Sequence, residues 1–247
     1  MKKLGIIGGL GPMATVYFLQ LVTQMSHAET DQEHMEIVLH SNPRIPDRTR
    51  FILGQSGDSP LPMMVQAGKG LVSLGAELIA VPCITAHYFH NRLEEEIGVP
   101  VINAPAETAL CLKEAGISSA GVMATDGTVA SGLVQKALEE EGIACILPDQ
   151  EGQKKVMSLI YEDIKAGRPG EPAKFKDVSG QLFGRGAEIV LLACTELSLV
   201  KRDSFKVYGG DPLGPEYVDI LEVLARKAVL SCGRLKDEYR NLIVKRQ

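Results

Sequence analysis

Short apolar runs alternate along this chain with helix-length segments that are bounded by glycine, proline or a capping hydroxyl. The apolar runs predict strands at residues 3–7, 36–40, 77–82, 99–102, 119–124, 143–147, 188–193 and 206–208. The segments between them predict helices near residues 13–27, 61–74, 85–96, 106–115, 128–141, 152–166, 173–185 and 214–231. This alternation is typical of an α/β fold with a mainly parallel, doubly wound sheet.

One phrase occurs twice in the sequence. The tripeptide Gly-Ala-Glu at residues 75–77 leads through an apolar run to Cys83, and the same tripeptide at residues 186–188 leads through another to Cys194. Each phrase is typical of a buried parallel strand with a thiol at its carboxyl end. Two such cysteines predict one thiol on each side of a shared cleft. That arrangement suits removal of a proton from one face of a carbon and its return on the other.

The predicted strands divide into two sets of four, and Gly5–Ile7 at the start of the first set resembles Gly121–Met123 at the start of the second. We therefore expect two similar doubly wound α/β domains, each with a mainly parallel four-stranded sheet, related by a pseudo-twofold axis. The last helix is expected to pack back on the first unit. The domains are then residues 1–104 plus 214–247 and residues 105–213, with the active site in the cleft between them.

Composition and charge narrow the function classes. The 247 residues are 45% hydrophobic and 23% charged, which is ordinary for a globular chain with a sizeable core. The net charge of −5 and scattered basic residues give no nucleic-acid footprint. The apolar run Leu4–Ile7 is broken at once by Gly8 and Gly9, so we expect no membrane span and a cytoplasmic protein. The five cysteines are odd in number and lack tight spacing, so neither a disulfide framework nor a structural metal site is expected.

Ligands of open parallel sheets bind beyond the carboxyl ends of the strands. The loop after the first predicted strand contains Gly9 and Gly11 before a helix, so its amides could approach an anion. Its glycine spacing does not match Gly-x-Gly-x-x-Gly, and no phosphate-loop lysine follows. A carboxylate fits this loop better than a nucleotide does, and a tight turn without any ligand fits it equally well.

The loop after the second predicted strand carries three arginines in an acidic protein. Arg44, Arg48 and Arg50 stand close to Pro43 and Pro46, which stiffen the loop. A guanidinium offers planar paired donors that match a carboxylate. Each of the three is a candidate carboxylate ligand, and each could instead be a solvated surface charge.

Both repeated cysteines precede expected helix starts, where the amino terminus of a helix stabilises a thiolate and lowers its pKa. A thiolate can act as a base, and a thiol on the opposite face can act as an acid. Cys111 and Cys232 fall within predicted helices and Cys145 within a predicted strand, so we assign these three to packing.

Five stretches, in this order, resemble the cofactor-independent aspartate/glutamate racemase superfamily, and most closely its aspartate racemase branch. They are Gly5–Pro12, Ser41–Thr49, Pro82–His87, Ala124–Thr128 and Ala193–Leu197. The resemblance runs to about residue 230. It implies a two-domain α/β fold, an interdomain site, a homodimer, a small and acidic amino-acid substrate, and exchange of the α-proton by two cysteines without pyridoxal or any other cofactor.

Carried over by position, the resemblance makes Cys83 and Cys194 the acid/base pair and Arg48 a clamp on a substrate carboxylate. It also indicates Lys165 as a second cationic contact, although a helix-end lysine facing water fits that position nearly as well. Four threonines are candidate donors around the amino acid, and each could instead cap a helix. They are Thr85, Thr125, Thr128 and Thr195.

The sequence departs from the family pattern at Ile84, where an asparagine usually follows the first cysteine. An aliphatic branch there removes a polar contact, so larger or less acidic amino acids become possible substrates beside aspartate and glutamate. His87 could tune Cys83 or serve the fold, and Glu196 could influence the proton on Cys194 or make a structural hydrogen bond; for both we expect the structural role.

Three other functions stay open at the level of sequence. The same framework resembles maleate isomerases, in which a strand-end cysteine adds to a double bond, and hydantoin racemases. A protein that binds a dicarboxylate or an amino acid without chemistry is the third. The matched thiols argue against pure binding, because a sensor has no need of an acid and a base.

Overall fold

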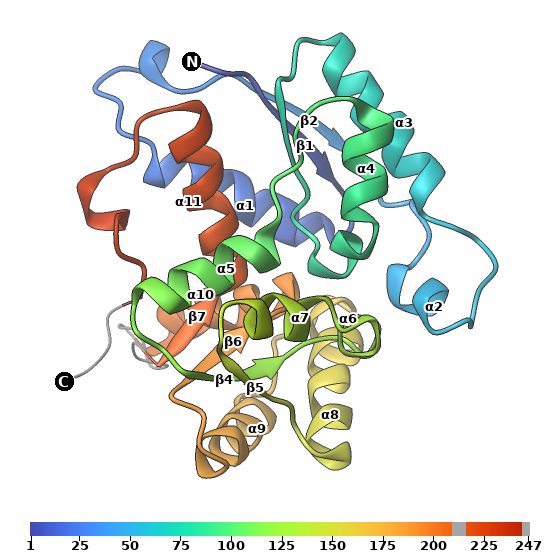
Figure 1. Cartoon of the computed structure of the whole chain (residues 1–247), viewed down its shortest axis with the longest axis vertical. Coiled ribbons are helices and arrows are strands. Elements are labelled where there is room, and N and C mark those ends of the chain that lie inside the picture. The colour runs from blue at the N-terminus through green and yellow to red at the C-terminus, as the bar shows by residue number, and fades with distance from the viewer. Residues whose placement is uncertain (209–215, 244–247) are drawn as a thin grey trace.

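The computed structural model describes residues 1–208 and 216–243, with only the backbone described for residues 204–208. Within these residues the strands form two parallel sheets (Figure 1). The first sheet has the order β2-β1-β3, with β1 (Leu4–Gly8), β2 (Ile37–Ser41) and β3 (Leu78–Ala80). The second has the order β5-β4-β6-β7, with β4 (Ser119–Met123), β5 (Ala144–Ile146), β6 (Ile189–Leu192) and β7 (Tyr217–Asp219). The expected α/β fold with two mainly parallel sheets is confirmed, but the first sheet has three strands where four were predicted.

Helices follow the strands along the described chain. The α-helices are α1 (Pro12–Met25), α2 (Arg48–Ile52), α3 (Leu61–Ser73), α4 (His90–Ile97), α5 (Ala104–Glu114), α6 (Asp126–Ser131), α7 (Leu133–Glu140), α8 (Gln150–Met157), α9 (Pro172–Gly184), α10 (Thr195–Tyr208) and α11 (Ile220–Cys232). Short 3-10 helices are η1 (Asp31–Glu33), η2 (Ile84–Phe89) and η4 (Asp237–Tyr239), and η3 (Ser158–Ile164) is a π-helix. Among the described residues no helix is both long and apolar enough to cross a bilayer.

Residues of the repeated phrase and of the helix before it pack against a strand glycine in the same way in both sheets. A Cβ on Gly5 would lie 2.8 Å from Ala76 and 3.3 Å from Leu71, and one on Gly121 would lie 3.2 Å from Ala187 and 2.9 Å from Leu182. These neighbours occupy matching positions before β3 and β6. Glycine in β1 and in β4 therefore lets the helix and turn that precede β3 and β6 pack closely on the sheet. The same arrangement in both halves is what a duplicated unit requires.

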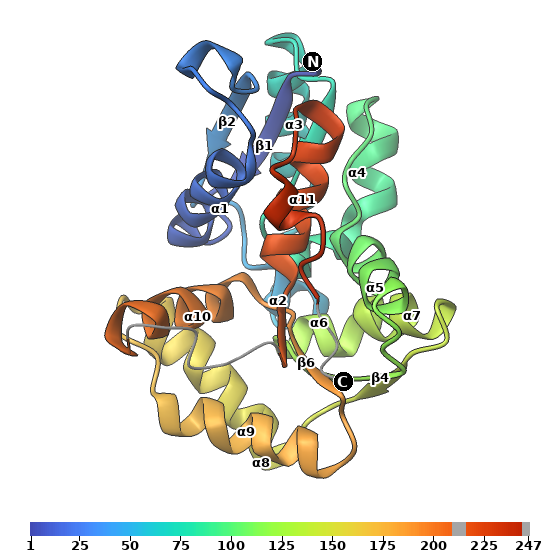
Figure 2. The ribbon, with the colours of Figure 1, turned by 90° about the vertical axis from the view of Figure 1, so that its left-hand side faces the viewer.

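The described buried side chains form three clusters. One lies between the first sheet and α3 and α4, and another between the second sheet and α8 and α9. The third joins the remaining faces of both sheets through α1, α5 and α11. Helix α11 lies beside α1 and α5 in Figure 2 and packs against both. It also packs against β3. The two halves therefore share part of one core, and the domain boundaries at residues 104 and 214 stay a prediction.

Two predicted strands are wrong in detail. Residues 206–208 continue α10, because a three-residue run does not compete with a helix that has already been nucleated at Thr195. The fourth strand of the second sheet is β7, which lies inside the predicted helix 214–231; residues 214 and 215 of that helix fall outside the described residues. Residues 99–102 form only one bridge, Ile79 to Val101, since Pro100 has no N–H for a ladder.

Three predicted helices are subdivided. The segment 85–96 is the 3-10 helix η2 followed by α4, and 152–166 is α8 followed by the π-helix η3. The segment 128–141 breaks at Gly132, which has a φ of 69° and separates α6 from α7.

Candidate active site

The predicted site residues follow the carboxyl ends of strands from both sheets. Cys83 lies just beyond β3 at the start of η2, and Cys194 lies between β6 and α10. Both thiols line one narrow cavity of about 10 Å³ and are buried, with 6% and 5% of their surfaces exposed. The two cysteines therefore reach a common space from separate sheets.

The narrow cavity adjoins a wider one of about 480 Å³. The two have five lining residues in common, which form a neck between them: Leu10, Asp47, Arg48, Lys165 and Glu196. The wider cavity is otherwise mostly apolar, with Met13, Ile45 and Leu199 in its wall. We call the narrow space the cysteine cavity and the wide one the outer chamber.

The structure brings most of the predicted site residues together. Besides the two cysteines, five of them line the cysteine cavity: Arg48, Thr85, Thr125, Lys165 and Thr195. Gly9 and Gly11 line the outer chamber only. Thr128 is fully buried and reaches the group through its hydrogen bonds to Thr85 and Thr125.

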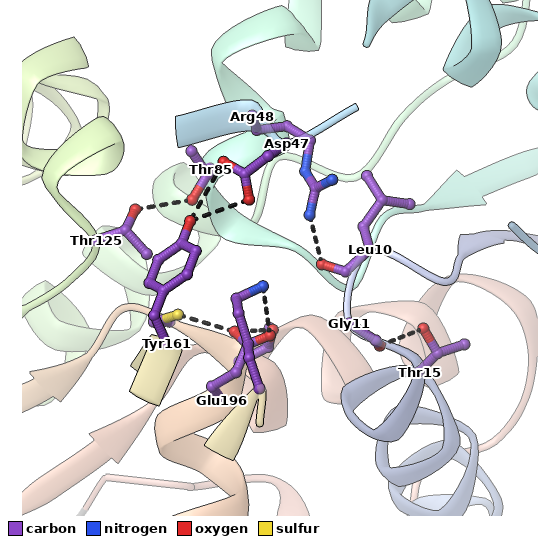
Figure 3. Close-up of polar contacts among 12 residues, drawn as sticks. Leu10, Gly11, Thr15, Asp47, Arg48, Thr85, Thr125, Tyr161 and Glu196 are labelled. Atoms are coloured by element: carbon purple, nitrogen blue, oxygen red, sulfur yellow. Dashed lines mark hydrogen bonds and ion pairs between the residues drawn. The ribbon is translucent and has the colours of Figure 1, made fainter. Parts of the chain in front are cut away.

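Arg48 is the arginine of the three that the fold brings to the site. Arg44 and Arg50 are exposed, whereas only 7% of Arg48 is exposed. Its Nη2 donates to the Leu10 carbonyl at 2.9 Å, as Figure 3 shows, and its Nη1 donates to the carbonyls of Ile45 and Pro46 at 3.2 and 2.9 Å. Among the described residues its buried Nε has no partner.

The surroundings of Arg48 favour its charged form. Burial alone would lower its pKa, but interactions with Cys83, Asp47 and Glu196 together outweigh burial, so the pKa of Arg48 lies above its ordinary value. A fixed guanidinium with an unpartnered buried donor can receive an anion. The backbone carbonyls, however, already take much of the donor fork that the sequence assigned to a ligand.

Glu196 connects the second cysteine to the predicted lysine. Its Oε2 accepts from Cys194 Sγ at 3.0 Å, and its Oε1 is 3.1 Å from Lys165 Nζ (Figure 3). Burial and then the Glu196 carboxylate raise the pKa of the Cys194 thiol well above its ordinary value, and Lys165 opposes them only in part. The predicted lowering of the pKa of Cys194 by the helix terminus is therefore wrong.

Lys165 follows the π-helix η3 and keeps a quarter of its side-chain surface exposed. Burial would lower its pKa, but the charges of Glu196, Cys194 and Cys83 together raise it above the ordinary value. Lys165 is thus a permanent cation at the neck. In this conformation its charge is balanced by Glu196.

Three of the threonines bond to one another. Thr85 Oγ1 is 3.0 Å from both Thr125 Oγ1 and Thr128 Oγ1, and those two are 3.1 Å apart. Thr125 also caps α6 by accepting from the Thr128 amide at 3.2 Å. The cluster joins η2 to α6, across the two halves of the chain. Thr195 begins α10, with its hydroxyl 3.4 Å from Glu196 Oε2.

Tyr161 is a lining residue that sequence reasoning missed. Its hydroxyl donates to the Asp47 carboxylate at 3.1 and 3.3 Å (Figure 3). Lys165 Nζ lies 5.2 Å from its ring centre. Asp47 also caps α2 by accepting from the amide of Arg50. The position of Tyr161 four residues before Lys165 on a helical segment was the available signal.

His87 serves the fold. It is buried, its Nε2 is 3.3 Å from the Val81 carbonyl, and its ring stacks on His90. Burial and then the neighbouring His90 lower the pKa of His87 to about 3, so the ring is neutral. Ile84 lines the cysteine cavity and also packs into the shared core.

The glycine loop is shaped by close contacts. Gly9 has a φ of 89°, and its amide donates to Thr15 Oγ1 at 2.9 Å, so an anion there would have to displace that bond. A Cβ on Gly11 would lie 2.6 Å from Glu196 Oε1, so only glycine lets the loop reach the carboxylate.

The rest of the described structure offers fewer candidate functional groups. A larger hollow of about 1010 Å³ near the end of α11 contains none of the predicted site residues. Within the described residues no group of three or more His, Cys, Asp or Glu side chains is placed to hold a metal ion.

The fold and the paired thiols define a class of protein. A family model described as Asp/Glu/Hydantoin racemase matches residues 7–228. The chain belongs to the Asp/Glu/Hydantoin racemase family, and the recognised resemblance is confirmed.

Particular relatives add detail. The chain is 32% identical to the Picrophilus torridus aspartate racemase, with a TM-score of 0.79 and coverage of 98% of this chain and 99% of that one. It is 25% identical to the broad specificity amino-acid racemase RacX of Bacillus subtilis (strain 168), over 80% of this chain and 86% of RacX. A glutamate racemase from Francisella tularensis, solved with D-glutamate, shares the fold at 14% identity and a TM-score of 0.64, covering 100% of this chain and 84% of that one.

Proposed function

We propose that this protein is a cofactor-independent amino-acid racemase in which Cys83 and Cys194 exchange the α-proton of the substrate. The observation that carries the proposal is the single cavity lined by both thiols, which belong to the two copies of one repeated phrase. Family membership and the racemases among its relatives support the same reaction.

The chemistry requires an acid and a base on opposite faces of Cα. One thiolate takes the α-proton, the C–H electron pair stays on the substrate, and the other thiol gives its proton to the opposite face. The roles reverse for the other enantiomer. An α-proton is very weakly acidic, so the carboxylate-bearing intermediate needs donors that are already aimed at it.

Arg48 is the proposed anchor for the α-carboxylate. Its unpartnered Nε points to a missing acceptor, since a buried donor without one costs about 1–3 kcal/mol. Its bonds to three backbone carbonyls keep the guanidinium in place before substrate arrives. A carboxylate oxygen at Nε would satisfy the donor and meet a charge that is permanently present.

Aspartate is the first substrate to test, because the Picrophilus torridus relative is an aspartate racemase. The side-chain carboxylate of an acidic substrate would bind Lys165 at the neck and share that cation with Glu196. The apolar wall of the outer chamber and Ile84 also admit a broader range of amino acids, in line with the name of RacX.

Substrate entry requires the site to widen. The cysteine cavity of about 10 Å³ holds at most one water molecule by the usual criterion. An amino acid therefore enters from the outer chamber and displaces the contacts at the neck. The Tyr161 hydroxyl bond to Asp47 and the Lys165–Glu196 pair are the polar contacts that such opening would strain.

The decisive experiment follows Cα hydrogen exchange in D₂O for D- and L-amino acids, with aspartate first. The wild type should incorporate deuterium into the inverted enantiomer. Cys83→Ala and Cys194→Ala should each lower racemisation by about 10²–10⁴-fold, the usual contribution of a positioned acid or base. Cys145→Ala is the matched control, because Cys145 lies in β5 outside both cavities and should racemise at the wild-type rate.

Partial activity separates one-base from two-base chemistry. A single remaining thiol can exchange the α-hydrogen of one enantiomer without inverting it. Full racemisation by either single-cysteine variant would contradict the proposal, and so would tight binding of amino acids by the wild type without any exchange. Turnover confined to maleate or to a hydantoin would replace it with the corresponding isomerase.

A further inference from the structure

The two cysteines have unlike surroundings, and the difference centres on Glu196. This carboxylate is only 5% exposed. It makes three polar contacts, to Cys194 Sγ at 3.0 Å, to Lys165 Nζ at 3.1 Å and to Thr195 Oγ1 at 3.4 Å. The Gly11 backbone also lies close to it, because a Cβ on Gly11 would be 2.6 Å from Glu196 Oε1.

The contact with Cys194 has a direction. A carboxylate is an acceptor, so a hydrogen bond to it requires Cys194 to be the protonated partner. Ionising Cys194 would place two negative charges about one hydrogen-bond length apart in a buried site, which is strongly unfavourable. Lys165, 3.1 Å from the other oxygen of Glu196, pairs with this carboxylate and holds it beside the thiol.

Cys83 lies in the opposite kind of environment. The Arg48 guanidinium and the Lys165 ammonium line the same cavity as Cys83, and a negative charge on Cys83 would raise the pKa of both. A thiolate at Cys83 therefore faces cations. A thiolate at Cys194 would be repelled by the Glu196 carboxylate more strongly than it would be attracted by Lys165.

We propose that Glu196 is a positioning residue that keeps the resting proton on Cys194, so that Cys83 starts each cycle as the proton acceptor and Cys194 as the donor. This inference rests on the proposed two-cysteine reaction and deepens it. The sequence interpretation favoured a structural role for Glu196, and the hydrogen bond to the thiol gives it a chemical one.

The proton balance of the cycle follows. The α-proton moves to Cys83, the electron pair remains on Cα, and the proton of Cys194 moves to the opposite face of Cα. The enzyme is left with a thiol at Cys83 and a thiolate beside Glu196, which is its less stable form. Proton return to Cys194 restores the resting form, and the opposite enantiomer must be bound by the minor form.

The test measures the ionisation of Cys194 directly. The ultraviolet absorbance of thiolate is titrated in each protein and in the same protein carrying Cys194→Ser, and the difference reports Cys194 alone. Glu196→Gln should lower the midpoint by about 1–3 pH units, the usual effect of one nearby charge. The basic limb of the pH profile of kcat/KM should move to lower pH with it, because the donor thiol then loses its proton earlier.

Two further variants keep the test decisive. Lys165→Met leaves Glu196 uncompensated and should move the midpoint upward, so it answers the question even if Glu196→Gln does not fold. Glu222→Gln is the matched control, because Glu222 pairs with Lys201 at 2.9 Å and does not line the cysteine cavity. This substitution should leave the midpoint of Cys194 unchanged. The titratable groups that line the cysteine cavity with Cys194 in all these titrations are Glu196, Lys165, Tyr161, Cys83, Arg48 and Asp47.

The outcomes separate this inference from the proposed function. An unchanged midpoint in folded Glu196→Gln overturns the role of Glu196, whether or not the enzyme racemises amino acids. Shifted midpoints in a protein that never exchanges a Cα hydrogen support the hold of Glu196 on the proton and overturn the racemase. Shifts in both the titration and the pH profile support both.

Discussion

At the scale of single residues, Arg48 combines a structural role with the proposed binding of a substrate carboxylate. Three backbone carbonyls from two loops accept from its Nη atoms, while its buried Nε has no hydrogen-bond partner among the described residues. A guanidinium can do both because its five donors lie in one rigid plane. The neighbouring Arg44 and Arg50 are exposed and have no such position.

Arg48→Lys should therefore affect both stability and binding. An ammonium group cannot reach three carbonyls and keep an aimed donor, so we expect the free energy of unfolding to fall by at least about 1.5 kcal/mol, the lower value for one hydrogen bond to a charged group. The KM should rise at the same time. Urea unfolding and steady-state kinetics measure the two effects.

The exposed Arg44 provides the comparison. Arg44→Lys should stay within about 0.5 kcal/mol of wild type with an unchanged KM. Equal effects of the two substitutions on KM would contradict the assignment of the carboxylate contact to Arg48.

The site could be predicted from the sequence where one residue type has few uses. A thiol at the end of a repeated apolar run singled out Cys83 and Cys194, which line one cavity, and the arginine loop contains Arg48, which lines the same cavity. The sequence left the choice among the arginines open, because exposure depends on how loops fold over each other. Tyr161 was not predicted as a site residue, because its contact with Asp47, 114 positions away, also depends on how distant segments fold together.

At the scale of elements, the long periodic segments were predicted well and the short ones poorly. Helices such as α3 and α9 were placed to within one residue at each end, because proline at the start and a turn at the end bound them. Strand 206–208 failed because a three-residue run takes the structure of its surroundings. The π-helix η3 was read as plain helix, since its extra residue per turn leaves no mark on the apolar pattern.

The contact between α2 and α6 sets how closely the two halves approach beside the site. A Cβ on Gly127 in α6 would lie 2.8 Å from the Thr49 Cα, which is backbone and cannot rotate away. Gly127→Ala should lower the free energy of unfolding by about 1–3 kcal/mol, as overpacked substitutions do. Urea unfolding measures the loss.

A second glycine gives a control of opposite sign. Gly180 lies within α9 and has open space around it in the described structure. Gly180→Ala should raise the free energy of unfolding by about 0.5–1 kcal/mol through helix propensity. A neutral or stabilising Gly127→Ala would mean that the halves are not tightly closed at α2 and α6.

At the scale of the whole molecule, the duplicated halves are joined by a common core and not by a flexible linker. Helices α1, α5 and α11 contribute to one cluster that contains residues of both sheets. The repeated phrases in the sequence predicted the duplication. They did not predict the common core, because that core depends on how the two halves pack against each other. The homodimer and the cytoplasmic location expected from the sequence stay predictions.

A buried carboxyl group at this junction makes stability depend on pH. Asp219 is the last residue of β7 and caps α11. Its Oδ1 accepts from Ser198 Oγ at 2.6 Å and from the Leu221 amide, and its buried Oδ2 has no partner among the described residues. Burial and then the nearby Glu222 raise the pKa of Asp219 to about 7, although Lys201 and the two hydrogen bonds oppose them. An unfolded aspartate has a pKa of about 3.9.

The sign of the effect follows from these two values. The folded state holds the proton more tightly, so the stabilisation is complete below about pH 4 and is lost as the pH rises through about 7, with a slope of up to about 1.4 kcal/mol per pH unit. Asp219→Asn cannot ionise, so the wild type should lose stability relative to this variant between those limits. Asp237→Asn, at a side chain 86% exposed, should run parallel to wild type. Urea unfolding across the range measures all three, and a constant difference between wild type and Asp219→Asn would show that Asp219 is already ionised in the folded protein below pH 4.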